Sequence, residues 1–281
     1  MHSMEYKVLP NGLKIPMIGM GTYPLKRLHL IDVLKSAGSA GYELYDTAHM
    51  YGNEGDIGFA IQNNILDRNK ILITSKICAT QYLGHRRYLY LDKQSVSRAY
   101  KNSCKLLGVD SIDIFLLHSP FKNNTKAYQE LISLYDKGKV KAIGVSNFNQ
   151  EQLDTLYKEV GGIPMINQIE IHPYNTMEDI IQYCNDREIV VEAYSPFGRG
   201  NILPEIMNNE TLIQFAQQHN KSVGQIILRW LVQQDIITVV RSSNPKRIQE
   251  NLEIFDFSLT DEQMKYISSL NQNKGYGKHF Q

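Results

Sequence analysis

Eight short apolar runs divide this chain, and each ends in a polar residue. The polar residues that follow the second to the eighth runs are Asp46, Lys76, His118, Ser146 and Asn147, Gln168 and Glu170, Tyr194, and Arg241 and Ser242. Strands that only build a core do not need Asp, Lys or His at their carboxyl ends, whereas a (β/α)8 barrel builds its active site there. The pattern therefore predicts a barrel whose chemistry lies on one face.

The segments between these runs support the same fold. Residues 5–9 and 13–17 flank Pro10-Asn11-Gly12, and Asn-Gly favours a tight turn between antiparallel strands. Helical patterns follow at 28–40, 54–65, 94–107, 125–137, 149–160, 177–187, 209–219, 222–234, 245–255 and 261–270. Ser222 is a candidate N-cap, and residues 260–263 have the spacing of a capping box. Alternating strands and helices predict an α/β fold, a (β/α)8 TIM barrel with an N-terminal hairpin and extra helices near the C-terminus.

The length of 281 residues fits one such barrel, which typically takes roughly 250. No Pro- or Ser-rich linker interrupts the sequence, so we expect one catalytic barrel domain over residues 1–281. A doubly wound nucleotide-binding fold is the main competitor. Its glycine fingerprint begins at Gly19 and Gly21, but Pro24 stands where the last glycine belongs, and there is no Walker A sequence.

Composition narrows the classes of partner. The net charge of +1 gives no general attraction to nucleic acid or to membranes, and no run of about 18 apolar residues is long enough to span a bilayer. No signal peptide opens the chain, and three cysteines without a CxxC pair favour a reducing compartment. The eight histidines lack metal-ligand spacing. We expect a cytoplasmic monomer without a metal and with neither nucleic-acid nor membrane partners.

Seven motifs, in order along residues 6–270, together resemble the aldo-keto reductase family. They are residues 46–54 (DTAHMYGNE), Lys76, and residues 116–120 (LLHSP), 144–148 (GVSNF), 167–173 (NQIEIHP), 193–196 (AYSP) and 241–251 (RSSNPKRIQEN). The resemblance implies NADPH-dependent reduction of an aldehyde or ketone to an alcohol, with hydride from the nicotinamide and a proton from Tyr51. It also implies a catalytic tetrad of Asp46, Tyr51, Lys76 and His118.

The chemistry of this tetrad can be argued independently. A carbonyl that accepts hydride needs a proton, but the phenol of Tyr51 has an ordinary pKa of about 10, too high for efficient transfer near pH 7. An ammonium such as Lys76 would lower that pKa, and Asp46 would supply the counter-charge. His118 can donate a hydrogen bond to the carbonyl oxygen. Each residue alone could equally be a cap, a packing aromatic, a loop lysine or a structural histidine; their occurrence on three successive strand ends favours the catalytic interpretation.

The other strand ends resemble a nicotinamide cleft. By the resemblance, Ser146, Asn147 and Gln168 bind the carboxamide and Tyr194 stacks on the ring, while Thr22 and Ser195 also lie against the cofactor. The amide has donors and acceptors that Ser, Asn and Gln can match, and an aromatic ring offers an apolar face. Alternatively, Ser146-Asn147 is a plain turn with an N-cap, and Tyr194 packs in the wall.

The segment after the last run is a candidate phosphate site. Guanidinium groups and a helix N-terminus both suit phosphate, and the resemblance places the adenosine 2′-phosphate here. Val240-Arg241 replaces the family's usual Pro-Lys pair, and the retained charge favours NADPH over NADH. The residues implied are Arg241, Ser242, Asn244 and Arg247 for the phosphate, and Glu250 and Asn251 for the adenine.

Two departures from the family bear on the substrate. Tyr23 and Ser119 stand where members often have tryptophans, which predicts a more polar pocket. Residues 81–90 form an unusually long loop with positive charges at His85, Arg86 and Arg87. If this loop borders the pocket, these side chains favour a polar, anionic or sugar-like carbonyl; otherwise it is solvated surface.

Two other functions remain open. A nicotinamide-nucleotide-sensing regulatory subunit would use the same barrel, although a complete tetrad argues against a catalytically dead sensor. An unrelated barrel isomerase or aldolase would use Lys76 as a Schiff-base nucleophile without a cofactor.

Overall fold

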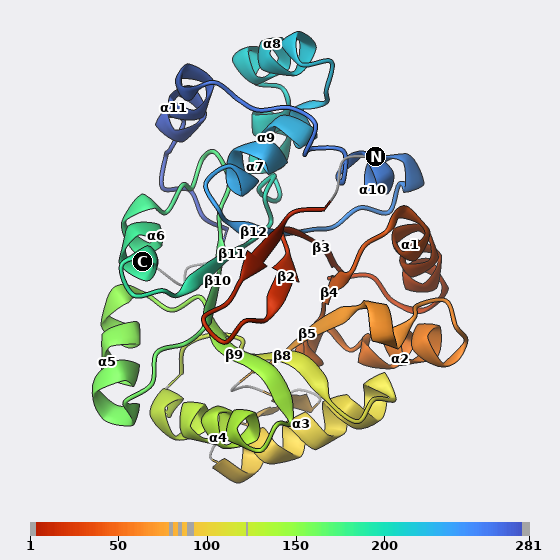
Figure 1. Ribbon diagram of the computed structural model, residues 1–281, viewed down its shortest axis with the longest axis vertical. Coiled ribbons are helices and arrows are strands. Elements are labelled where there is room, and N and C mark those ends of the chain that lie inside the picture. The colour runs from red at the N-terminus through yellow and green to blue at the C-terminus, as the bar shows by residue number, and fades with distance from the viewer. Residues whose placement is uncertain (1–3, 79–80, 84–85, 89–92, 122, 277–281) are drawn as a thin grey trace.

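A closed barrel of eight parallel strands forms the centre of the structure (Figure 1). The structure is a computed structural model that describes residues 4–78, 81–83, 86–88, 93–121 and 123–276. The barrel strands are β3 (Ile18–Gly21), β4 (Leu44–Asp46), β5 (Leu72–Ile77), β8 (Ile112–Leu117), β9 (Val140–Ser146), β10 (Ile166–Glu170), β11 (Val190–Tyr194) and β12 (Ile237–Val240). They pair in sequence order, and β12 closes the ring on β3. The predicted (β/α)8 fold is confirmed.

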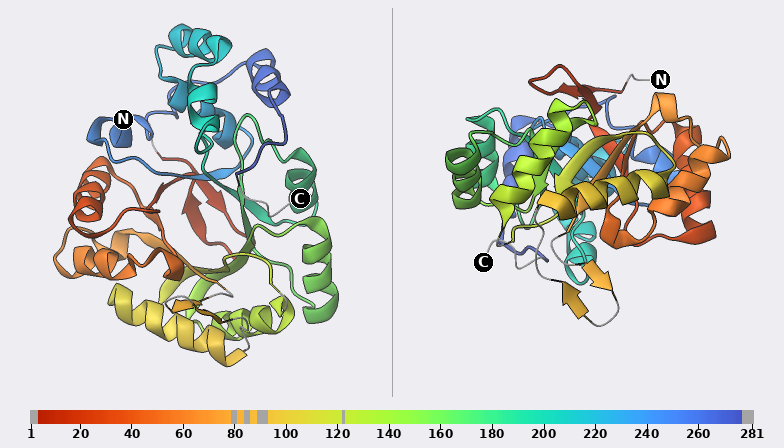
Figure 2. Two further views of the ribbon diagram at one scale, coloured as in Figure 1. Left: turned by 180° about the vertical axis from the view of Figure 1, so that it is seen from behind. Right: turned by 90° about the horizontal axis from the view of Figure 1, so that it is seen from below.

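Helices surround the barrel as the alternation predicted (Figures 1 and 2). They are α1 (Arg27–Ala40), α2 (Glu54–Gln62), α3 (Lys93–Leu107), α4 (Asn124–Asp136), α5 (Gln150–Val160), α6 (Glu178–Asn185), α7 (Ile202–Met207), α8 (Glu210–Gln218), α9 (Val223–Val232), α10 (Pro245–Glu250) and α11 (Asp261–Ser269). The capping boxes at Ser222 and Thr260 both form. Two expectations change: α7 was not foreseen, and α10 ends at Glu250 instead of continuing to residue 255.

The predicted N-terminal hairpin consists of β1 (Tyr6–Val8) and β2 (Lys14–Pro16), paired antiparallel. Gly12 supplies the positive φ of +86° that the turn requires. The hairpin leads directly into β3, so it lies at the amino ends of the barrel strands, and Figure 1 shows it across the barrel centre. Leu9, Ile15 and Met17 are buried there. Because their side chains join the core, the hairpin closes this end of the barrel.

A second hairpin corrects the prediction of an irregular loop after β5. Strands β6 (Gln81–Leu83) and β7 (Arg86–Tyr88) pair antiparallel, with Gln81 opposite Tyr88. They project from the side of the barrel opposite β1 and β2 (Figure 2, right). The interleaved aromatic residues of this segment favour strand pairing, which explains the difference. His85 lies outside the described residues, as do the side chains of residues 81–83, 86–88 and 93–95.

Packing inside the barrel depends on small residues at close contacts. At Gly144 in β9, a Cβ atom would lie 2.4 Å from the carbonyl oxygen of Ile166 on β10, so no larger residue fits without a shift. Trp230 in α9 is 1% exposed, as expected for a packing residue.

Among the described residues, no helix is long and apolar enough to cross a membrane, and no group of three His, Cys, Asp or Glu side chains is placed to hold a metal ion.

Candidate active site

The four residues of the predicted tetrad lie together at the carboxyl ends of three neighbouring strands. Asp46 ends β4, Lys76 lies near the end of β5, and His118 directly follows β8. These strands are adjacent in the barrel. Tyr51 ends the short helix η1 (His49–Tyr51) that follows β4. The barrel register therefore gathers residues that are up to 72 positions apart, from Asp46 to His118.

A buried ion pair forms the base of this site. The ammonium of Lys76 lies 2.7 Å and 2.6 Å from the two carboxylate oxygens of Asp46, and it donates to the carbonyl of Thr47 at 3.0 Å. Lys76 is completely buried and Asp46 is 4% exposed. Burial lowers the pKa of Lys76, but the Asp46 carboxylate, the Tyr51 phenol and Glu192 together raise it above its usual value. Lys76 is therefore held as a cation.

Tyr51 lies beside this cation. The Lys76 Nζ atom is 5.2 Å from the centre of the Tyr51 ring. Burial raises the pKa of the phenol, while the charge of Lys76 and its hydrogen bond lower it, as does the charge of Arg199. Lys76 thus acts in the expected direction, but burial outweighs it and the net pKa of the phenol is raised in the protein alone. The physical reason is that Asp46 cancels much of the ammonium's charge and burial disfavours phenolate.

His118 completes the group. Its ring meets the Tyr51 ring edge-on, with centroids 5.5 Å apart and an interplanar angle of 76°. Its carbonyl accepts a hydrogen bond from the Asn147 amide at 3.3 Å, which ties the end of β8 to the end of β9. The imidazole therefore borders the same opening as the Tyr51 phenol, where it can orient a carbonyl oxygen.

Two residues that sequence reasoning overlooked hold the segment around Tyr51. The Asn53 amide donates to the Leu25 carbonyl at 3.0 Å and to Thr22, and its oxygen accepts from Thr47 at 2.6 Å. The Glu54 carboxylate accepts from Ser75 at 2.6 Å and lies 3.4 Å from His49. Both side chains are 1% exposed. The available sequence signal was the polar pair Asn53-Glu54 at the start of a helix that also carries apolar residues.

Thr22 belongs to this support. Its hydroxyl donates to the Asp46 carbonyl at 2.9 Å and accepts from Asn53, and the residue is fully buried. This arrangement makes Thr22 a positioning residue for Asp46. Its side chain presents no surface to a ligand, in contrast to the cofactor contact that we expected from the sequence.

The predicted nicotinamide residues also converge. Ser146 and Gln168 lie on neighbouring strands, and the Ser146 hydroxyl donates to the Gln168 carbonyl at 2.8 Å. The Asn147 amide donates to the Ser146 hydroxyl at 3.0 Å, and its oxygen accepts from the Tyr194 hydroxyl at 2.8 Å. Tyr194 is half-buried. The side chains thus form one hydrogen-bonded set with an aromatic wall, which fits a flat ring that carries an amide.

The orientation of the Gln168 amide follows from two carboxyl groups. Its nitrogen donates to Asp46 at 2.8 Å and also to Glu192, a residue of β11 that sequence reasoning passed over. A flipped amide would direct its oxygen at both carboxyl groups, so the nitrogen must face them. The Gln168 oxygen is then the atom left to accept a hydrogen bond.

The predicted phosphate segment lies at the end of β12 and the start of α10. Arg241 and Arg247 are exposed, and neither forms a salt bridge with a carboxylate of the described residues. The Asn244 side chain caps α10 by accepting from the backbone of Lys246 and Arg247. Asn244 already occupies these N–H groups, so the helix terminus is not free to bind an anion. The feature of this segment that suits phosphate is therefore its cationic side chains.

The other predicted residues of this segment form contacts within the protein. Glu250 lies 3.6 Å from the ammonium of Lys246, and Ser242 is 9% exposed and accepts from the Asn244 backbone. Asn251 is 6% exposed and hydrogen-bonds the Tyr42 side chain. The structure thus leaves Glu250 near the surface but buries the Asn251 amide.

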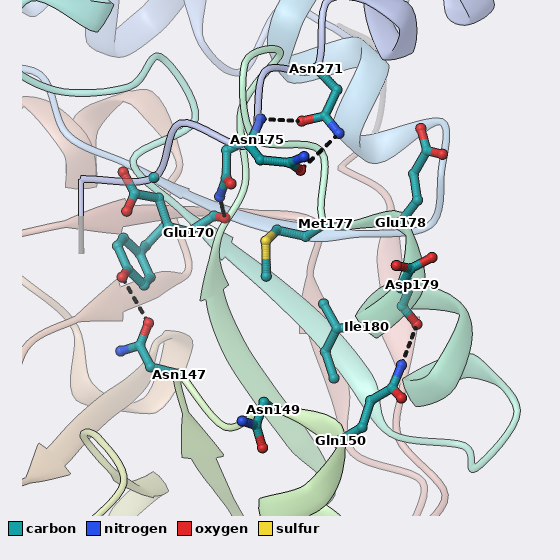
Figure 3. A pocket seen from close by; sticks show the side chains of 13 residues that line it. Asn147, Asn149, Gln150, Glu170, Asn175, Met177, Glu178, Asp179, Ile180 and Asn271 are labelled. Carbon is teal, nitrogen blue, oxygen red and sulfur yellow. Dashed lines mark hydrogen bonds between the residues drawn. The ribbon is translucent and has the colours of Figure 1, made fainter. Parts of the chain in front are cut away.

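A cavity of about 560 Å³ adjoins Asn147 and Tyr194 (Figure 3). Side chains from the turn after β9, from the end of β10, from the start of α6 and from the segment after α11 line it, among them Glu170, Glu178 and Asp179. Three carboxylates make this cavity unsuited to phosphate.

Two of the residues expected to line a substrate pocket, Tyr23 and Ser119, follow the carboxyl ends of β3 and β8. Tyr23 is 47% exposed and its ring lies 4.9 Å from that of Tyr51. The hydroxyl of Ser119 lies 4.0 Å from the sulfur of Cys78. The proposed contacts of His85, Arg86 and Arg87 lie outside the described residues and side chains.

Arg199, which follows β11, was not foreseen. Its guanidinium lies 5.7 Å from the Tyr23 ring and 5.4 Å from the Tyr194 ring, and it donates to the Ser195 hydroxyl. A positive φ of +52° at Ser195 and one of +70° at Gly198 turn the chain back over the opening. Ser195 therefore positions this arginine at the mouth of the site.

A parallel eight-stranded barrel with an Asp-Lys ion pair, a tyrosine and a histidine at its strand ends defines a barrel oxidoreductase. The sequence profile of the aldo/keto reductase family matches residues 17–272. The chain belongs to the aldo/keto reductase family. It is therefore an oxidoreductase that acts on carbonyl groups of small molecules, and membership supports a nicotinamide cofactor.

Individual relatives cover nearly the whole chain. An uncharacterized oxidoreductase of Bacillus subtilis is 38% identical over 98% of this chain and 96% of its own length. Glyoxal reductase of the same organism is 37% identical over 96% of this chain and 94% of its own. Among solved structures, an aldo-keto reductase from Bombyx mori in complex with NADP superposes with a TM-score of 0.86 at 31% identity, covering 98% of this chain and 95% of that one.

Proposed function

We propose that this protein reduces an aldehyde or ketone to an alcohol with NADPH, and that Tyr51 supplies the proton. The observation that carries the proposal is the Tyr51 phenol beside the buried Lys76–Asp46 ion pair, with the His118 ring at its edge. The nicotinamide, when bound, supplies the hydride. Ser146, Asn147 and Gln168 would hold its carboxamide and Tyr194 would pack on its ring.

The protein's own task is to move one proton. The Tyr51 phenol releases it to the carbonyl oxygen, and the phenolate that forms is stabilised by the ammonium of Lys76. The raised resting pKa of Tyr51 keeps the phenol protonated before the reaction. His118 orients the carbonyl oxygen. A site that keeps the acid protonated and stabilises only its product form favours the transition state over the resting state.

The preference for NADPH is supported by charge. Arg241 and Arg247 present two exposed guanidinium groups at one segment, and a dianionic 2′-phosphate matches them. The Bombyx mori structure, solved with NADP, is consistent with this preference.

The test is the Tyr51→Phe variant, assayed by NADPH absorbance with a simple aldehyde. We expect activity to fall about 10² to 10⁴-fold, the range for removal of a general acid, while NADPH binding measured by fluorescence is retained. Tyr100→Phe is the matched control, because this buried tyrosine lies on α3 and donates to the Lys139 carbonyl, away from the tetrad. Turnover of the Tyr51→Phe variant above a tenth of wild type would remove Tyr51 from this role.

The structure disfavours one of the two alternative functions, the Schiff-base aldolase, and leaves the nucleotide-sensing subunit to experiment. A Schiff-base nucleophile must be a neutral, accessible amine, whereas Lys76 is fully buried and paired with Asp46. The aldolase reading is therefore disfavoured. A nucleotide-sensing subunit would bind NADPH without oxidising it, so the same absorbance assay with a panel of carbonyls separates sensor from enzyme.

We further propose a polar or anionic carbonyl as the substrate. Arg199 lies over Tyr23 and Tyr194, and its charge acts on Tyr51. A carbonyl at the Tyr51 hydroxyl would therefore have its neighbouring substituent within reach of a guanidinium, which suits a carboxylate.

A further inference from the structure

One buried acid in the barrel interior has no place in the mechanism above. Glu192 is fully buried, and it lies directly opposite Gln168 in the parallel pairing of β10 and β11. Two residues further along β11, on the same side of the strand, is Tyr194. Glu192 therefore lies one layer deeper in the barrel than the proposed nicotinamide wall.

Glu192 contacts the site through Gln168. One carboxyl oxygen accepts from the Gln168 amide nitrogen, which also donates to Asp46 at 2.8 Å. Both N–H bonds of the amide are thereby used. Loss of the Glu192 carboxyl would leave one of them unsatisfied in the interior and free the amide to rotate.

The charges around Glu192 do not balance if it is ionised. The charged groups that face it are Asp46 on β4 and Lys76 on β5, while β10 contributes a neutral amide and β12 places Ile237 opposite it. Lys76 is already paired with Asp46. The second Glu192 oxygen is buried without a hydrogen-bond partner among the described residues. A second buried anion without a cation is costly, so the carboxyl is favoured in its neutral form.

We propose that Glu192 is a positioning residue of this site. It holds the amide of Gln168, and its proton keeps the surroundings of the Asp46–Lys76 pair free of a second negative charge. Burial raises the pKa of Glu192, and the Asp46 charge raises it further, to about 7, against an ordinary value of 4.5. Glu192 therefore gains its charge within the neutral pH range.

This charge would act on the proton of Tyr51. The Asp46 carboxylate already raises the pKa of the phenol, and an ionised Glu192 would act in the same direction. Proton release from Tyr51 to the carbonyl then becomes less favourable as pH rises through about 7. This kinetic part rests on the proposed function, whereas the burial of a protonated carboxyl does not.

The kinetic experiment compares kcat at pH 6 and pH 8 for wild type, Glu192→Gln and Glu192→Asp, with NADPH and an aldehyde. We expect the wild-type rate to fall about fivefold, the factor for about 1 kcal/mol, and the Gln variant to fall less than about twofold. Glu192→Asp retains a carboxyl and should retain the fall. A wild-type fall that persists in Glu192→Gln, or is lost in Glu192→Asp, would overturn the proposal.

A second measurement does not need activity. The native state holds a proton on Glu192 that the unfolded chain has lost, so this group's stabilisation is complete below about pH 4.5 and is lost as pH rises through about 7. The melting temperature of the cofactor-free wild type should therefore fall from pH 5 to pH 8 relative to Glu192→Gln. An unchanged difference between the two proteins would contradict a buried neutral carboxyl.

The matched control is Glu130→Gln. Glu130 is also buried, at 5% exposure, but it lies on α4 and accepts from Ser97 outside the barrel interior. It should leave the pH dependence of kcat as in wild type. A wild-type protein that oxidises no NADPH at either pH would refute the proposed function, while the melting experiment would still decide the state of Glu192.

Discussion

Replacement of Lys76 by methionine tests the buried ion pair directly. Methionine is an unbranched side chain only one atom shorter than lysine, and it removes the charge. Lys76 and the Asp46 side chain are 0% and 5% exposed, and their charged atoms are 2.6 Å apart. Removal of one partner of a buried pair typically costs about 3–5 kcal/mol. Asp46 keeps its hydrogen bond from Gln168, so we expect the lower value, about 3 kcal/mol, at pH 8.

The pH dependence of this loss identifies its cause. Without the ammonium, the buried Asp46 carboxylate is stabilised by taking up a proton, which is easier at pH 5 than at pH 8. Lys76→Met should therefore be less destabilising at pH 5. Urea unfolding at the two pH values measures both numbers. Equal destabilisation at both, or none at pH 8, would refute the reasoning.

A second lysine provides the control. Lys141 also pairs with a buried aspartate, Asp113, at 2.8 Å, but it is 56% exposed and Asp113 keeps Arg68 as a partner. Lys141→Met should cost less than about 1 kcal/mol, as exposed pairs do. Lys76→Met should also lose at least about 100-fold in reductase activity, because the phenolate of Tyr51 loses its cation.

The remaining predictions concern the ligands and the packing. Arg241→Ala should weaken NADPH binding about tenfold or more and leave NADH binding nearly unchanged; equal weakening of both in a fluorescence titration would exclude a 2′-phosphate contact. Arg199→Leu should raise KM selectively for an aldehyde that carries a carboxylate, and an equal rise in KM for a neutral aldehyde would argue against recognition of the anion. Gly58→Ala should lower the melting temperature, because its Cβ would lie 2.3 Å from the Leu106 carbonyl oxygen; an unchanged value would show that α2 and α3 can separate.

Much of the fold and the tetrad could be predicted from the sequence, because both depend on a repeated local signal. A polar residue after an apolar run is informative at Asp46, Lys76 and His118, since a buried strand otherwise ends in a turn. The Asn-Gly turn and the capping boxes are likewise local, and the structure contains them. What these residues have in common is that no distant contact is needed to recognise them.

The parts that were missed depend on contacts across the barrel. Glu192 stands inside an apolar run, and its importance follows only from its pairing with Gln168. The signal was present, since Glu192 is two positions before Tyr194 and must share its face in a strand. Arg199 reaches the opening only because of the turn after Ser195, which residue order does not show. The cap that Asn244 forms on α10 has a local signal, an asparagine directly before Pro245, which the sequence reasoning passed over.

The hairpin of β1 and β2 has a consequence for the order of events during turnover. Since it seals the amino end of the barrel, both reactants must use the opposite opening, and they must share it. A nucleotide held against Tyr194 lies deeper than a carbonyl held near the exposed Tyr23 ring. With the nucleotide at its proposed site against Tyr194 and the carbonyl in front of it, the nucleotide would bind first and leave last. Steady-state kinetics should accordingly follow a compulsory sequence, with the alcohol leaving before the oxidised nucleotide.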